Sequence, residues 1–208
     1  MSRLVIVGAG DHGRVVLELL RSAGEAPHGF VEPGELEGAR EVDGLAVIGS
    51  LAGRPEWASD TTRFVVAVGD NRARRDAFER CLAMGMLPVA AIHPTAHLLA
   101  GAEVEPGGVV CAGAVIGLAA RVGANAIVNT GATIDHDDVV GVHATVAPGA
   151  HLAGRVILGE GAFVGIGASV REGITVGEWA LVAGGAMVVD DVPPGSQVAG
   201  VPARPLGT

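Results

Sequence analysis

The segment NTGATIDHDD, residues 129–138, carries the side chains best suited to acid–base chemistry in this chain. His136 is followed directly by two carboxylates, Asp137 and Asp138. Histidine titrates close to neutral pH, so an imidazole beside a carboxylate can take a proton from an attacking nucleophile as a general base. A lone exposed histidine is weak evidence, and its meaning depends on the elements that hold it.

Those elements follow from a six-residue repeat that runs from Ile92 to Val188. An aliphatic residue occurs at every sixth position over seventeen hexads, and the fourth residue after it is alanine in twelve of them. Side chains two apart share one face of a strand, so this spacing predicts short strands with both residues inside a parallel β-helix. The repeat resembles that of hexapeptide proteins, whose triangular turns contain three hexads. Seventeen hexads then give between five and six turns, and residues 18 apart stack in columns.

Two positions in these columns bear on His136, which is the third residue of its hexad and is expected at a corner outside the core. Gly154 lies 18 residues later, so its amide is expected one turn along the same column. A base beside a backbone donor suits acyl transfer, because the donor can stabilise an oxyanion. Asp138 falls at the inward position, and its column neighbours Ala120 and Val156 offer no side-chain partner. We therefore expect a local polar network around this carboxylate.

The first 90 or so residues lack the repeat and predict a small, mostly parallel α/β domain. A strand over Arg3–Val7 leads into GAGDHG and a helix. Further apolar runs cover 29–32, 45–48 and 64–68, and a second helix is expected over 72–84 with Asn71 as N-cap. Residues 87–93 are expected to close the sheet and lead into the first coil. The predicted domains are 1–90 and a β-helix over 91–208 with a proline-rich C-terminal cap.

The GAGDHG turn, residues 8–13, matches G-x-G-x-x-G between a strand and a helix. Glu32, at the end of the next strand, stands roughly where a ribose-binding acid would, so NAD is one interpretation. About 90 residues are too few for the usual six-stranded dinucleotide-binding sheet, which favours a nucleotide whose phosphate sits at the same turn. His12 is interpreted either as a contact of that ligand or as a solvated residue of the first helical turn.

The amino-acid composition makes several classes of function improbable. The net charge is −9 and there is no lysine, which argues against a nucleic-acid-binding surface. Cys81 and Cys111 lie in unrelated segments, and no secretory signal is recognised, so we expect a reduced, cytoplasmic protein. No window has about 18 uninterrupted apolar residues, so no membrane insertion is expected.

Together these motifs, with VGDN at 68–71, GIGASV at 165–170 and AGVPAR at 199–204, resemble a known family. These are the hexapeptide-repeat acyltransferases of the sialic acid O-acetyltransferase and nucleotide-aminosugar N-acetyltransferase type (NeuD/PglD-like). The resemblance implies a homotrimer of left-handed β-helices that binds acetyl-CoA between neighbouring subunits. It also implies an N-terminal Rossmann-like domain that holds the nucleotide sugar. No bound metal is expected.

The resemblance also implies roles for individual residues. The catalytic histidine falls on His136, the acid that raises its basicity on Asp137, and a nearby asparagine on Asn129. Nucleotide-sugar contacts fall on Gly10, Asp11, His12, Glu32 and Gly69, and coenzyme contacts on Thr145, Ile166 and Gly184. The chain departs from the usual family pattern at four positions. Thr145 stands where the family usually has a second histidine, and Asp138 stands where it usually has a cysteine. Glu32 replaces a usual aspartate, and Asp11 replaces a glycine that many relatives have.

The implied activity is acetyl-CoA-dependent N-acetylation of a nucleotide-linked amino sugar by direct transfer. Acetylation of a hydroxyl stays open, since it needs the same base and coenzyme. A covalent route through Cys111 is disfavoured because no base lies near it in sequence. Two functions of other classes also remain open. A zinc hydratase like the gamma-class carbonic anhydrases needs three converging imidazoles, but His136, His143 and His151 do not share a column. A non-enzymatic protein that binds a nucleotide sugar is suggested by Thr145.

Overall fold

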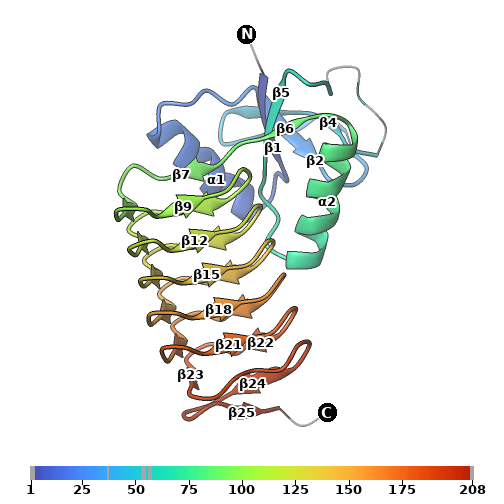
Figure 1. Ribbon diagram of the computed structural model, residues 1–208. Helices are drawn as coiled ribbons and strands as arrows, with labels where there is room; N and C mark the ends of the chain where they lie inside the picture. The colour runs from blue at the N-terminus through green and yellow to red at the C-terminus, as the bar shows by residue number, and fades with distance from the viewer. Residues whose placement is uncertain (1–2, 37, 53–54, 56–57, 207–208) are drawn as a thin grey trace.

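The computed structural model describes residues 3–36, 38–52, 55 and 58–206. A small α/β layer sits at one end of a long solenoid, and helix α2 runs down beside the solenoid's first coils (Figure 1). The predicted fold class, a small parallel α/β domain followed by a left-handed parallel β-helix, is confirmed.

The N-terminal sheet has six strands in the order β3-β4-β2-β1-β5-β6, so the expectation that about 90 residues are too few for six strands is wrong. The six strands fit because β3 and β6 are only two residues long. All of its pairs are parallel except β3 with β4. The parallel strands carry apolar runs because both faces of the sheet are covered. The bounds are β1 (Arg3–Val7), β2 (Gly29–Glu32), β3 (Glu41–Val42), β4 (Leu45–Ser50), β5 (Thr62–Val66) and β6 (Leu87–Pro88), with helices α1 (Asp11–Ser22) and α2 (Asn71–Ala83).

The start of α2 differs from the prediction. Asp70, not Asn71, is the N-cap, and its carboxylate accepts a hydrogen bond from the amide of Ala73 at 2.8 Å. Both residue types cap helices well, so sequence alone could not separate the two neighbours. Asn71 is instead the first helical residue, and its side chain donates to the carbonyl of Gly161 at 3.0 Å in the solenoid.

Seventeen two-residue strands, from β7 (Ala91–Ile92) to β23 (Met187–Val188), build the solenoid. Each pairs in parallel with the strand 18 residues away, as predicted. The first solenoid sheet contains β7, β10 (Val109–Val110), β13 (Ile127–Val128), β16 (Thr145–Val146), β19 (Phe163–Val164) and β22 (Leu181–Val182), followed by β24 (Gln197–Ala199) and β25 (Arg204–Pro205). The second contains β8 (His97–Leu98), β11 (Val115–Ile116), β14 (Thr133–Ile134), β17 (His151–Leu152), β20 (Ser169–Val170) and β23. The third contains β9 (Glu103–Val104), β12 (Arg121–Val122), β15 (Val139–Val140), β18 (Ile157–Leu158) and β21 (Thr175–Val176).

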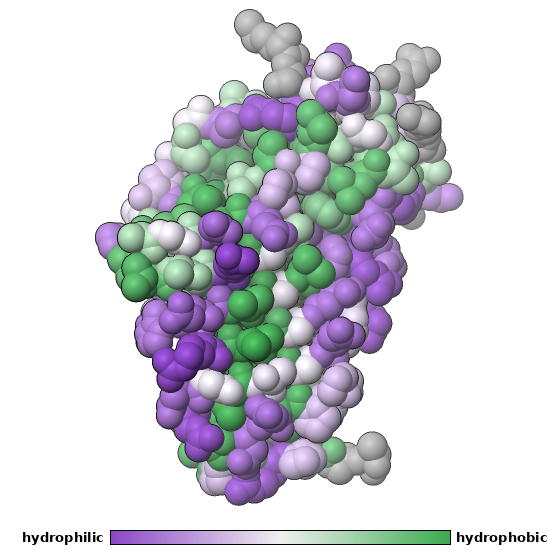
Figure 2. All heavy atoms as spheres, in the orientation of Figure 1, coloured by the Kyte–Doolittle hydropathy of each residue, from purple (hydrophilic) through white to green (hydrophobic). Residues whose placement is uncertain are grey.

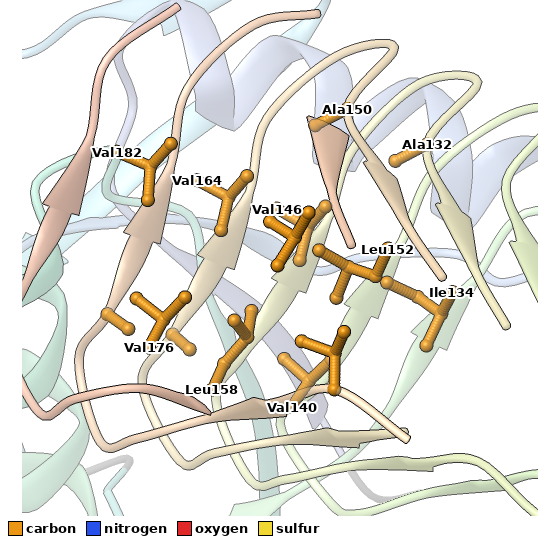
Figure 3. Packing of buried hydrophobic residues seen from close by; sticks show 14 of the residues in the cluster. Ala132, Ile134, Val140, Val146, Ala150, Leu152, Leu158, Val164, Val176 and Val182 are labelled. Carbon is orange, nitrogen blue, oxygen red and sulfur yellow. The ribbon is translucent and has the colours of Figure 1, made fainter. Parts of the chain in front are cut away.

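The solenoid core consists of the aliphatic and small residues of the repeat. Figure 3 shows them stacked coil upon coil, with Val146, Val164 and Val182 in one column and Ala132 and Ala150 in another. Burying this apolar surface is the main source of stability, at about 25 cal/mol for each Å² removed from water. The corners are therefore held by a rigid, regular support.

The two parts of the chain pack against each other. Helix α1 contacts β7 and shares one buried cluster with Val109 and Ile127 of the first solenoid sheet. Helix α2 is bonded to the solenoid through Asn71, which donates to the Gly161 carbonyl and accepts from the Thr145 hydroxyl. The division near residue 90 stays a prediction. Within the described residues, no helix has both the length and the apolar character needed to cross a membrane.

Candidate active site

His136 lies at the corner between β14 and β15, where the chain turns from the second to the third solenoid sheet. Its Nδ1 lies 2.9 Å from Oδ2 of Asp137, and both side chains are exposed, at 43% and 60%. An ionised carboxylate can only accept, so Nδ1–H donates to Asp137 and leaves Nε2 free to take a proton. Asp137 has a φ of +61°, a left-handed conformation that aspartate tolerates better than most residues.

Gly154 lies directly beneath the imidazole of His136, as the column predicts. A Cβ placed on Gly154 would lie 2.6 Å from His136 Cε1 and 2.9 Å from Cδ2, so only glycine leaves room for the ring in this orientation. Within the described residues, the Gly154 amide donates to no acceptor of the chain. The corner thus brings together an imidazole, a carboxylate and a backbone N–H.

Asp138 is fully buried behind this corner. Its Oδ2 accepts the amide of Asp135 at 2.9 Å and its Oδ1 accepts the amide of Val156 at 2.7 Å. These bonds confirm the expected polar network. Desolvation raises the pKa of Asp138 to about 7, against the lowering effect of the two amides and of nearby His136.

Asn129 lies at a different corner, between β13 and β14. Its Oδ1 accepts the amide of Thr130 at 2.8 Å. The structure therefore brings His136, Asp137 and Gly154 together, and it places Asn129 one corner earlier on the same coil.

The glycine turn joins β1 to α1. Gly8 has a φ of +110°, and a Cβ on Gly13 would lie 3.1 Å from the carbonyl carbon of Gly8 and closer still to its oxygen, so the turn needs glycine at both positions. Gly10 and Gly69 behave differently: a Cβ at either meets no atom within 4 Å. The space in front of these two residues is open to a ligand.

His12 follows this turn at the start of α1. Burial, and then the charge of Arg74, lower the pKa of His12 to about 4, so its imidazole is neutral at pH 7. Its Nε2 is buried and has no hydrogen-bond partner among the described residues. This excludes the solvated interpretation of His12 and leaves a polar atom that a ligand could satisfy.

Arg74 holds the loop that contains Val68 and Gly69, a role that the sequence analysis did not predict. Its fully buried guanidinium donates to the carbonyls of Val68 at 3.1 Å and Gly69 at 3.2 Å, and to the carbonyl of His143 at 2.7 Å in the solenoid. Burial lowers its pKa to about 10, which still leaves it charged at pH 7. The sequence carries no signal for this role, because four arginines lie within 72–80 and look alike.

Three cavities lined by described residues adjoin the N-terminal part of the chain. One of about 300 Å³ lies between residues 69–72, Gly69 among them, and the solenoid residues Gly161, Phe163, Trp179, Ala180 and Leu181. The other two differ in size. The larger, about 610 Å³, lies between α1 and the corner that follows β10 and β13, and it is lined by Asp11, Arg14, Val15, Glu18, Leu19, Asp43, His93, Cys111, Ala112 and Thr130. The smaller, about 220 Å³, is lined by Glu32, Glu35, Leu36 and Arg40. Glu32 forms an ion pair with Arg40, so this predicted contact residue is already neutralised by a cation that the sequence analysis did not single out.

The three predicted coenzyme residues fall into two environments. Ile166 and Gly184 share one corner column, and the Ile166 side chain is 64% exposed. Thr145 instead faces α2 and is only 5% exposed; its hydroxyl donates to Asn71 Oδ1 at 2.7 Å and accepts from Arg74 at 3.1 Å. The structure does not bring Thr145 to the surface that carries Ile166.

Comparisons with known proteins cover the whole chain. Residues 3–81 match the PglD N-terminal domain family. The acetyltransferase domain of PglB from Neisseria gonorrhoeae, solved in complex with acetyl coenzyme A, is 37% identical with a TM-score of 0.91, and the match covers 99% of both chains. PerB from Caulobacter crescentus, solved in complex with CoA and GDP-perosamine, is 37% identical with a TM-score of 0.92, covering 100% of this chain and 98% of PerB. The chain belongs to the PglD-like family of hexapeptide-repeat sugar acetyltransferases.

WeeI from Acinetobacter baumannii, at 24% identity and a TM-score of 0.87 over 98% of this chain and 99% of its own, shares the fold of this PglD-like family member. No curated protein sequence gives a match.

The two cysteines, His143 and His151 lie in environments other than the His136 corner. Burial raises the pKa of the Cys111 thiol to about 11 and that of Cys81 to about 12, which disfavours a thiolate nucleophile in this PglD-like chain. His143 is buried beside Asn125, with 2.8 Å between its Nδ1 and Asn125 Nδ2, and His151 Nδ1 bonds Thr133 on the second sheet. Within one chain these two imidazoles and His136 belong to separate environments. In the described residues no group of three or more candidate metal ligands is found.

Proposed function

We propose that this protein is an acetyl-CoA-dependent N-acetyltransferase that acts on a nucleotide-linked amino sugar, with His136 as the general base. The observation that carries the proposal is the His136–Asp137 pair above a buried glycine, in a chain 37% identical along its whole length to PerB. PerB binds CoA and GDP-perosamine, and the PglB domain binds acetyl coenzyme A.

In the proposed reaction, the sugar amine attacks the thioester carbonyl while Nε2 of His136 takes its proton. A C–N bond forms, the C–S bond breaks, and the imidazolium returns the proton to the CoA thiolate. Asp137 keeps Nδ1 protonated and stabilises the imidazolium, since it accepts the Nδ1 hydrogen at 2.9 Å. The Gly154 amide is proposed as the donor to the oxyanion. General-base catalysis contributes about 10²- to 10⁴-fold to such a step.

The nucleotide sugar is proposed to bind at the glycine turn and extend into the 610 Å³ cavity. Gly10, the N-cap of α1, faces open space at a helix N-terminus, where a phosphate is favoured, and Asp11 is the first helical residue. His12 supplies a buried, neutral and unsatisfied nitrogen, and the Gly69 loop is held open by Arg74. Glu32 is proposed to act together with Arg40, whose guanidinium also contacts the Ala9 carbonyl at 3.3 Å.

We further propose that the site is completed between subunits of a trimer. His136 and Asn129 lie at successive corners, and the lining of the large cavity includes Thr130 and not His136. Apolar side chains stand exposed beside both corners: Leu118, one coil before His136, at 53%, and Ile166, in the Thr130 column, at 64%. Figure 2 shows a hydrophobic band along the middle of the solenoid face, where the exposed apolar residues of the third sheet include Val139 and Ile157.

Acetyl-CoA is proposed to lie along the Ile166–Gly184 column, at the edge where a second subunit would pack. Thr145 could contact it only after α2 moves away. We propose that the protein works in the cytoplasm, because its two cysteines are unpaired. We propose neither a nucleic acid nor a membrane as a partner.

The proposal is tested by calorimetric titration of the purified protein with GDP-perosamine, UDP-linked amino sugars, acetyl-CoA and NAD, followed by measurement of CoA release. Binding of an amino-sugar nucleotide and acetyl-CoA, with turnover that needs both, is the expected result. Heat with NAD alone would overturn the nucleotide-sugar assignment. Binding of both ligands without any CoA release would favour the non-enzymatic alternative.

A further inference from the structure

Asp138 is an exception within its own repeat. The equivalent inward position of the other sixteen hexads holds only alanine, glycine, valine or isoleucine. Asp138 is nevertheless fully buried, between Ala120 and Val156 of the adjacent coils. A buried carboxylate is costly without partners, so its presence needs a physical reason.

The hydrogen bonds of Asp138 give that reason. At most corners the amide of the inward residue donates to the carbonyl three residues earlier, as Ala132 does to Asn129 and Ala144 to Gly141. Val156, the inward residue one coil later, instead donates its amide to Oδ1 of Asp138 at 2.7 Å, and Oδ2 of Asp138 accepts the amide of Asp135 at 2.9 Å.

The hydrogen bonds of Asp138 are connected to His136 through one further hydrogen bond. Asp135, whose amide is held by Asp138, accepts the amide of His136 with its Oδ1 at 2.7 Å. The carboxylate of Asp138 therefore ties the loop that carries His136 to the next coil, the coil on which Gly154 lies beneath the imidazole. Removing it would leave the loop without both side-chain anchors.

We propose that Asp138 is a positioning residue of the acetyl transfer, which fixes the His136 imidazole over Gly154 by closing the catalytic corner with a buried carboxylate. The inference rests on the proposed function for its effect on turnover. Asp138 does not contact substrate in this account and acts only through the Asp135–His136 loop.

The charge of Asp138 adds a pH dependence to this role. The charged groups that face it are Asp135, which raises its pKa, and His136, which lowers it; Ala120 and Val156 contribute no charge. Only the ionised carboxylate accepts both amides fully, and its charge favours the cationic form of His136. With its pKa raised to about 7, Asp138 loses this ionised form as the pH falls through neutrality.

The test compares Asp138→Asn and Asp138→Ala with the wild type and with Val156→Ala. The last variant removes inward packing one coil away and keeps the Val156 amide, so it is the matched control for stability. We expect both Asp138 variants to lose about tenfold or more in kcat, with the acetyl-CoA KM within about twofold of the wild-type value. The control should keep its kcat per folded protein.

A second readout separates positioning from simple structural support. We expect NMR titration of the His136 ring to give a lower pKa in Asp138→Asn than in the wild type, and the acid limb of the kcat profile to move with it. Unchanged kcat per folded protein, or an unchanged His136 pKa, would overturn the proposal. A wild type without turnover would refute the proposed function instead, and the ring titration would still decide whether Asp138 acts on His136.

Discussion

Replacing Gly154 by alanine is expected to disable the catalytic corner without unfolding the solenoid. The new Cβ would lie 2.6 Å from His136 Cε1, whereas ordinary van der Waals contact begins near 3.4 Å, so the ring must move by about 1 Å. The imidazole is 43% exposed at a corner and can rotate toward solvent, which keeps the cost in folding free energy small. A displacement of this size at a reacting group costs about 10²-fold in rate, or about 2.7 kcal/mol of transition-state stabilisation.

The assay for Gly154→Ala is the initial rate of CoA release at saturating acetyl-CoA and amino-sugar nucleotide, with chemical denaturation of the same samples. Glu172→Ala is the matched control, because Glu172 occupies the next position of the same column and is exposed. We expect the control to keep wild-type turnover. Wild-type kcat in Gly154→Ala would refute the argument that the imidazole works from its place over Gly154.

Three further predictions follow from other contacts. His136→Ala should lose about 10²- to 10⁴-fold in kcat while acetyl-CoA binding and oligomeric state stay unchanged, since the side chain carries no core packing; loss of folding in parallel with activity, seen by circular dichroism, would count against the assignment. Arg74→Leu should lower the free energy of unfolding by about 3 kcal/mol in urea titration, because several buried carbonyls lose their donor, and an unchanged midpoint would contradict this. Asp138→Ala should gain stability relative to the wild type, by about 2 kcal/mol, as the pH rises from about 4 to about 7. The carboxyl ionises near its ordinary pKa in the unfolded chain and only near pH 7 in the folded protein, so the wild type loses stability over that range; parallel pH profiles of stability would refute the shift.

The solenoid was predictable because each of its positions is determined by a few residues of a short repeat. The inward place of Ala132 or Val146 follows from spacing alone, and so does the stacking of Gly154 beneath His136. Asp138 could be recognised for the same reason, since a carboxylate breaks an apolar column.

The contacts between the two parts of the chain could not be predicted in this way. Arg74 bonds carbonyls near residues 68 and 143, and these are brought together only by the docking of α2 on the solenoid. Thr145 loses its expected surface position through the same docking. The Glu32–Arg40 pair joins two segments for which no sequence pattern sets a distance.

The most direct test of the account is the chemical identity of the acetylated product. The protein is incubated with an amino-sugar nucleotide such as GDP-perosamine and acetyl-CoA isotopically labelled at the acetyl carbonyl, and the label is followed by NMR. The account predicts an amide carbonyl on the sugar nitrogen, formed by the wild type and almost absent with His136→Ala. An ester on a sugar hydroxyl, a labelled protein thioester, or equal product from His136→Ala would contradict it.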